Sequence, residues 1–161
     1  MDRREMLGVL GTTAGALALG ASGRALADEP QIPIHDHGKM RISCLEACGH
    51  CSVVCDETAR HCLMMLAEGK GDAKYHAKAH SLMADCAMFC SLSATMIARK
   101  SELMVESCQA CAAACKACGQ ECEKSDAKEM KECAEACRAC EKSCLAMVEH
   151  MRGSAEPAAR R

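Results

Sequence analysis

Cysteine residues recur every three or four positions through most of this chain of 161 residues. A spacing of three and four residues places side chains on one face of an α-helix. The pattern therefore predicts helices whose buried faces carry thiols where Leu or Ile would normally stand. The sixteen cysteines form four groups: Cys44, Cys48, Cys51, Cys55 and Cys62; Cys86 and Cys90; Cys108, Cys111, Cys115, Cys118 and Cys122; and Cys133, Cys137, Cys140 and Cys144.

The rest of the composition offers little else from which to build a core. The chain has one Tyr, one Phe and no Trp, and large aliphatic residues are sparse beyond the N-terminal segment. Met and Cys, which both carry soft sulfur, make up the difference. The net charge of −2 indicates neither nucleic acid nor an anionic membrane surface as a partner.

The first 27 residues have the features of an export signal. Arg3 and Arg4 precede a weakly apolar stretch over residues 8–20, and Ala25–Ala27 fits a cleavage site. The arginine pair and the Gly-rich stretch favour the twin-arginine route, although Asp2 departs from the usual Ser or Thr. The alternative, a membrane anchor, needs a longer apolar run of roughly 20 residues. We therefore expect export to the periplasm or another extracytoplasmic compartment, without a stable membrane anchor.

Turn-forming residues divide the mature chain into an arm, four helices and a tail. The Pro-containing residues 28–39 are predicted to be a flexible arm, and residues 153–161 a disordered tail. Helices are expected over residues 40–68, 72–99, 102–124 and 126–152. Asp72 is the expected N-cap of the second helix, and Asp126 with Glu129 forms a capping-box pattern at the fourth.

The boundary between the second and third helices carries no Gly or Pro. We place the turn at Lys100–Ser101, because one helix over residues 72–124 would be about 80 Å long and would expose its thiols. Short loops between similar helices favour an antiparallel, up-down four-helix bundle. The predicted fold is therefore all-α, with a cysteine-lined core formed by residues 40–152.

Disulfide bonds are the first explanation for many thiols in an exported chain. Neighbouring cysteines on one helix face have Cβ atoms about 5–6 Å apart, whereas a disulfide requires roughly 3.5–4.5 Å. Bonds along one helix would be strained, and bonds between helices stay possible. A disulfide-stapled thiol redox or structural bundle therefore remains an alternative function.

Metal binding fits the continuous spacing better. Structural zinc usually takes four ligands from separate Cys-x2-Cys knuckles with turns at the metal, but a metallothionein-like zinc or cadmium buffer remains open. Cu(I) is soft, prefers thiolate and thioether ligands, and accepts two or three of them. If each thiolate bridges two ions, one Cu(I) per cysteine leaves the core neutral, which predicts about sixteen ions. No pattern indicates catalysis, so we expect a protein that is not an enzyme.

These features together resemble the exported branch of the copper storage protein family. The resemblance rests on the signal, on the His- and Met-containing segment at residues 35–40, and on the Cys-x3-Cys-x2-Cys-x3-Cys runs. It covers about residues 40–151 and implies a homotetramer of bundles that stores Cu(I) for a copper-requiring client enzyme or a copper chaperone. All sixteen cysteines match the family's metal-lining positions, and His37 and Met40 lie in the segment similar to its His/Met-rich start.

Methionines gather at one end of the predicted bundle. Met40 and Met104 lie at the starts of the first and third helices, and Met147 and Met151 near the end of the fourth. Uncharged thioethers hold Cu(I) more weakly than thiolates do, so this end is predicted to be where copper enters and leaves. The alternative is that these methionines fill gaps in the core.

The remaining candidate ligands lie toward the other end. Met83 is three residues before Cys86 on the same face and is a further candidate ligand. His76 and His80 are four residues apart and could hold one metal, but we expect them to be a solvated polar pair.

Overall fold

The computed structural model describes residues 37–155, which form four α-helices. The helices are α1 (His37–Ala67), α2 (Ala73–Ala98), α3 (Met104–Cys122) and α4 (Lys128–Ala155). Helix α1 begins earlier than predicted, at His37, and α4 continues beyond Gly153 to Ala155. The predicted signal at residues 1–27, the arm up to residue 36 and the tail from residue 156 lie outside the described residues.

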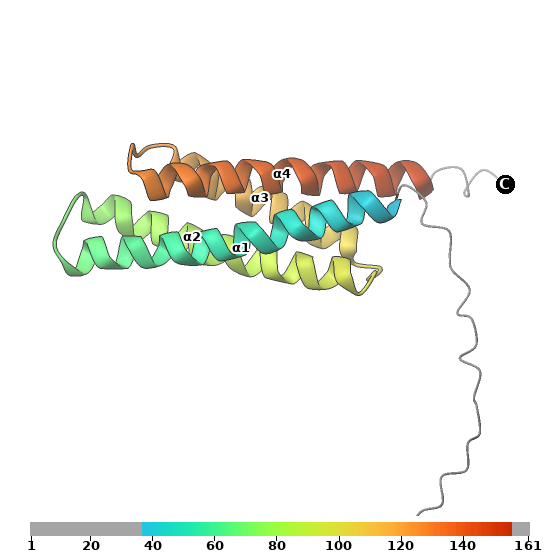
Figure 1. Ribbon diagram of the computed structural model, residues 1–161, viewed down its shortest axis with the longest axis horizontal. Helices are drawn as coiled ribbons and strands as arrows, with labels where there is room; N and C mark the ends of the chain where they lie inside the picture. Colours follow the sequence, from blue (N-terminus) through green and yellow to red (C-terminus); the bar gives the residue numbers. More distant parts are fainter. Residues whose placement is uncertain (1–36, 156–161) are drawn as a thin grey trace, which may run out of the picture. The chain divides into compact units, whose positions relative to one another are not determined.

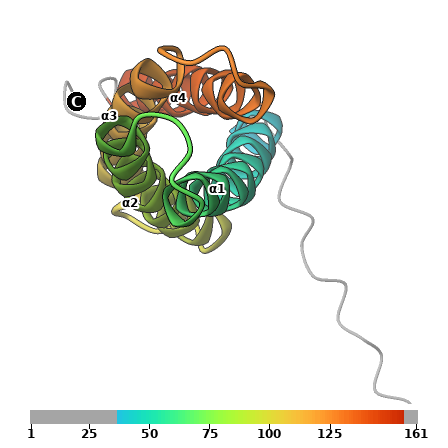
Figure 2. The ribbon, with the colours of Figure 1, turned by 90° about the vertical axis from the view of Figure 1, so that its left-hand side faces the viewer.

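Successive helices run in opposite directions beside one another (Figure 1). Seen along their axes, the four helices surround a common centre (Figure 2). Helix α1 packs against α2 and α4, and α3 packs against the same two helices. The prediction of an antiparallel, up-down four-helix bundle is confirmed. The beginnings of α1 and α3 and the ends of α2 and α4 consequently share one end of the bundle (Figure 1).

Two glycines and an aspartate make the reversal between α1 and α2. Gly69 and Gly71 have φ angles of 63° and 68°, a region that glycine enters without a steric cost. The Asp72 carboxylate accepts hydrogen bonds from the backbone N–H of Lys74 at 2.8 Å and of Tyr75 at 3.2 Å. These bonds satisfy donors of the first turn of α2 and confirm Asp72 as its N-cap.

The reversal between α2 and α3 is made without a glycine. Lys100 has a φ of 54°, and its N–H donates to the Ile97 carbonyl at 3.2 Å while that of Ser101 donates to Met96 at 3.0 Å. This pair of bonds is the Schellman arrangement that usually ends in glycine. A side chain in this left-handed region costs about 1 kcal/mol. The turn lies at Lys100–Ser101, as predicted.

Helix α4 begins at Lys128, two residues later than expected. The predicted capping box is not formed, because the Asp126 carboxylate pairs with the Lys131 ammonium at 2.8 Å. The hydroxyl of Ser125 instead accepts the N–H of Ala127 at 3.2 Å. The prediction that α4 starts at Asp126 was therefore wrong, and Asp126 belongs to the preceding loop.

Candidate metal centre

The sixteen thiols all lie on the inner faces of the four helices, where each cysteine is 0% exposed. Five come from α1, two from α2, five from α3 and four from α4. None is bonded to another, so all are free thiols. We call the volume that they line the thiol core.

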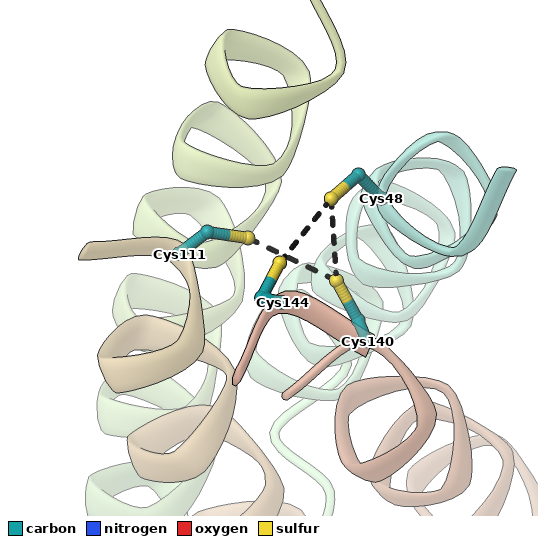
Figure 3. A group of neighbouring side chains, drawn as sticks. All are labelled: Cys48, Cys111, Cys140 and Cys144. Atoms are coloured by element: carbon teal, nitrogen blue, oxygen red, sulfur yellow. Dashed lines mark hydrogen bonds between the residues drawn. The ribbon is translucent and has the colours of Figure 1, made fainter. Parts of the chain in front are cut away.

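One part of the thiol core shows how helices far apart in sequence bring sulfurs together (Figure 3). Cys48 comes from α1, Cys111 from α3, and Cys140 and Cys144 from α4. The Sγ atom of Cys48 lies 3.5 Å from that of Cys144 and 3.7 Å from that of Cys140. The Sγ atoms of Cys111 and Cys140 are 3.8 Å apart. These four sulfurs lie within 4.8 Å of one another and can bind one ion together.

Six groups of side chains among the described residues could hold an ion. Five of them, each of four thiols, follow one another along the thiol core, and each shares two cysteines with the next. The shared pairs are Cys111 and Cys140, Cys90 and Cys115, Cys51 and Cys86, and Cys55 and Cys137. The groups are, in this order, Cys48/Cys111/Cys140/Cys144, Cys90/Cys111/Cys115/Cys140, Cys51/Cys86/Cys90/Cys115, Cys51/Cys55/Cys86/Cys137 and Cys55/Cys118/Cys133/Cys137. The thiols are therefore not divided into separate sites.

The sulfur separations match those that a bound soft ion requires. With a metal–sulfur bond of about 2.3 Å, two sulfurs on opposite sides of an ion lie about 4.6 Å apart, and three in a plane about 4.0 Å apart. Between helices, the Sγ atoms of Cys86 and Cys115 are 3.6 Å apart, and those of Cys55 and Cys133 are 3.8 Å apart. Ions can enter between these thiols with sulfur shifts of about 1 Å or less.

Helix α2 supplies only Cys86 and Cys90 to the thiol core, and both reach thiols of α3. The Sγ atom of Cys90 lies 3.5 Å from that of Cys111 and 3.6 Å from that of Cys115. Met83, one turn before Cys86, is fully buried on the same side. Its placement beside the thiols agrees with a ligand role, which stays a prediction.

Met130 is a further buried thioether, which the sequence reasoning missed. It lies on α4, is 0% exposed and belongs to the same core cluster as the thiols. Met130 precedes Cys133 by three residues, the offset by which Met83 precedes Cys86. That offset was the available signal, because residues three apart share a helix face.

The four methionines predicted to gather at one end of the bundle do lie there, and we call this end the methionine end. Met104 and Met147 are buried in the core cluster, and Met40 and Met151 are partly buried and pack against it. All four lie at the end where α1 and α3 begin and α4 ends (Figure 1). Of His37 only the backbone is described, as the first residue of α1. Its proposed metal contact stays a prediction.

The opposite end of the bundle holds Cys62 near the end of α1, Cys122 as the last residue of α3 and Cys133 near the start of α4. Burial raises the pKa of the Cys62 thiol to about 11, and the charges of Cys133 and Cys118 add to this effect. This thiol is therefore protonated at neutral pH, and a metal ion must displace its proton to bind. Hydrogen bonding to Cys118 first, and then to Cys133, raises the pKa of Cys122 as well.

His76 does not form the solvated pair that was expected with His80. It is only 7% exposed, and no hydrogen-bond partner of its Nδ1 atom is found among the described residues. The ring lies edge-on to those of Tyr75 and His61. A Cβ atom at Gly71 would lie 2.8 Å from its Nε2 atom. The glycine loop therefore leaves the space in which His76 is buried, a tertiary effect that helix spacing does not contain.

Comparison of the sequence with models of known protein families identifies the family of this chain. The family model described as copper storage protein matches residues 37–149. This chain belongs to the copper storage protein family. The match spans all sixteen cysteines of the thiol core. A search of the curated proteins gives no match.

Solved structures of copper storage proteins share the bundle. The Cu(I)-bound copper storage protein BsCsp3 is 31% identical over 68% of this chain and 98% of its own, with a TM-score of 0.61. Apo copper storage protein 3 from Bacillus subtilis is 33% identical over 66% of this chain and 97% of its own, with a TM-score of 0.58. A cytosolic copper storage protein from Streptomyces lividans, solved with five coppers, is 29% identical over 69% and 93%, with a TM-score of 0.62.

Proposed function

We propose that this chain stores Cu(I) in the thiol core at about one ion per cysteine, or about sixteen ions in total. The observation that supports this proposal is the series of four-thiol groups, each of which shares two cysteines with the next. A shared thiolate can bridge two ions, so the core is suited to a continuous cluster. The role is storage and buffering, without catalysis.

The charges of the core favour Cu(I) over zinc. Four thiolates around one Zn²⁺ leave two negative charges, whereas one Cu(I) per thiolate leaves none. Among residues 37–155, no Lys or Arg side chain is buried that could balance the excess charge. An unbalanced buried charge costs several kcal/mol. A zinc ion held by four unshared thiols would therefore be balanced only if two of the four stayed protonated.

Anaerobic titration of the reduced apoprotein with Cu(I) is expected to saturate near sixteen ions, about one per thiol. About one proton should be released per ion at neutral pH, because the bound thiols ionise. The measurement is competition with a chromophoric Cu(I) chelator, followed by metal analysis. Saturation at four ions or fewer would contradict the proposal.

Titration of two serine variants tests whether single thiolates bridge two ions. Cys115 belongs to two of the four-thiol groups, whereas Cys62 belongs to none of the five. Cys115→Ser is expected to lose about two ions, because one bridging thiolate is removed, and Cys62→Ser about one at most. Equal losses from both variants would argue against bridging.

We also propose that copper passes through the methionine end. The double change of Met40→Leu and Met104→Leu preserves apolar volume but removes two thioether ligands. We expect transfer of Cu(I) to a chelator to slow by about tenfold, or about 1.4 kcal/mol in barrier, with the capacity unchanged. Met64→Leu, at an exposed position of α1, is the matched control. Equal transfer rates in all three proteins would rule out the entry role.

We infer, finally, that the stored copper serves a client enzyme or a chaperone outside the cytoplasm. The support is the arginine pair and cleavage pattern in residues 1–27, which lie outside the described part of the chain. Fractionation of cells that express the full chain would check this location.

A further inference from the structure

The buried face of α2 has a histidine where the other three helices have cysteines. A series of four buried residues follows this face at intervals of seven: His76, Met83, Cys90 and Ile97. An interval of seven residues returns a side chain to nearly the same face of a helix. His76 therefore lies on the side of α2 that carries its thiols, at the end of the bundle where α1 is followed by α2 (Figure 1). We call this end the loop end.

One nitrogen of the His76 ring is buried without a partner. No hydrogen bond to its Nδ1 atom is found among residues 37–155. The side chain is only 7% exposed, so bulk water does not compensate for the missing bond. Buried polar atoms in proteins are nearly always paired, with protein groups or with an ordered water or ion. The Nδ1 atom is therefore a position at which a ligand is expected.

Packing holds the ring so that this nitrogen stays available. A Cβ atom at Gly71 would lie 2.8 Å from the Nε2 atom and 3.3 Å from the Cδ2 atom of His76. The ring edge that carries Nε2 thus packs against the glycine. The ring centre lies 5.2 Å from that of Tyr75 and 6.2 Å from that of His61, both edge-on. These contacts orient the imidazole without using its Nδ1 atom.

A buried thiol lies at the same end of the bundle. Cys62 is 0% exposed, yet it belongs to none of the five four-thiol groups. Cys62 lies five residues before the end of α1 and His76 three residues after the start of α2, which correspond to depths of about 8 and 5 Å from the loop. The neighbour of Cys62 in sequence, His61, is the residue whose ring contacts His76. Helix α2 offers no cysteine at this depth, and His76 takes that place.

We propose that His76 and Cys62 bind one Cu(I) ion at the loop end, through the Nδ1 atom of His76 and the thiolate of Cys62. The proposal rests on the storage function and adds a nitrogen ligand to it. Cu(I) is bound by thiolate and also by imidazole. The thiolate balances the charge of the ion and a neutral imidazole adds none, so the buried site is uncharged. The proton of the Cys62 thiol is released to solvent when the ion binds.

Nuclear magnetic resonance of the imidazole nitrogens tests the contact directly. The reduced full chain, labelled with ¹⁵N-histidine, is titrated anaerobically with Cu(I) to saturation, and the His76 signals are assigned with His76→Leu. Binding engages the lone pair of Nδ1, so we expect this resonance to shift. His80, one turn further along α2 and only partly buried, is the control, and its ring nitrogens should stay unchanged.

Copper capacity gives a second measurement, by competition with a Cu(I) chelator and metal analysis. His76→Leu and Cys62→Ser are each expected to lose about one ion, and the double variant no more than either alone, because both changes remove the same ion. His80→Leu is expected to keep the full capacity. Helical circular dichroism of each apo variant checks the fold, and His76→Gln replaces a His76→Leu variant that loses helix.

The outcomes separate this proposal from the storage function. A chain that fills its thiols with Cu(I) while the His76 nitrogens stay unchanged overturns the proposal and leaves storage intact. Losses that add up in the double variant also overturn it, since they show that His76 and Cys62 do not share an ion. A chain whose thiols take up no Cu(I) overturns both proposals.

Discussion

Loading with Cu(I) is expected to raise the midpoint of thermal unfolding of the bundle by tens of degrees. The thiol groups are assembled from helices far apart in sequence, so the unfolded chain does not present them. Each ion held at a free concentration 1,000 times its Kd stabilises the fold by about 4.1 kcal/mol. Three such ions contribute about 12 kcal/mol, and about 3 °C per kcal/mol is typical of domains near this size.

Anaerobic circular dichroism melts at increasing copper equivalents measure this rise. The midpoint should climb with each addition and should return to the apo value after a strong Cu(I) chelator removes the metal. A reduced sample treated with the chelator alone is the control. If the midpoint stays constant while the thiol core fills, the thiols that bind copper are not those that the four helices assemble.

Ile97→Ala is expected to destabilise the apo bundle by about 3 kcal/mol, because it opens a cavity where little other hydrocarbon is buried. Ile97 is 0% exposed, and the other largest fully buried side chains are Met83, Met130, Met147 and cysteines. Total stabilities of single domains are only about 5–15 kcal/mol. One aliphatic side chain therefore carries a large share of the stability of the apo form.

Urea unfolding of the reduced apoprotein measures this effect. Ile42→Ala is the matched control, because Ile42 is 53% exposed and its loss should change the free energy of unfolding by less than about 0.5 kcal/mol. Copper should restore the fold of Ile97→Ala, since metal–thiolate bonds then hold the helices together. Equal unfolding curves for both variants would show that Ile97 is not a main support of the apo core.

The helices and their inner faces were predictable because both are local properties. A spacing of three and four residues fixes a helix face wherever it occurs, so the burial of every cysteine followed from the sequence. The turn at Lys100 followed from the length that an unbroken helix would have, although no glycine marks it. The sequence did not predict how far each helix is shifted along the bundle axis relative to its neighbours, because the loops determine these shifts. The pairing of Cys90 with Cys111, for example, depends on that turn.

Two predictions were wrong because of contacts that helix spacing does not contain. The start of α4 was misplaced because Asp126 has a competing partner in Lys131, five residues along the chain. His76 was expected in solvent, but the loop at Gly71 folds beside it. Met130 precedes Cys133 by three residues and is buried with the thiols, so its burial could have been predicted from the same spacing. Thiols and thioethers share one buried face in this core, so its lining is predicted from the positions of Cys and Met together.

The sharing of thiols between neighbouring groups has a consequence for how the protein fills. An ion bound in one group takes over ligands that the next group also needs, so occupancies along the bundle depend on one another. The thiol core then behaves as a one-dimensional lattice with coupling between nearest neighbours, as repeat proteins do in folding. No single affinity describes such a lattice. We expect copper bound early and copper bound late to differ in how readily they leave, so that one small bundle holds both a reserve and an exchangeable fraction.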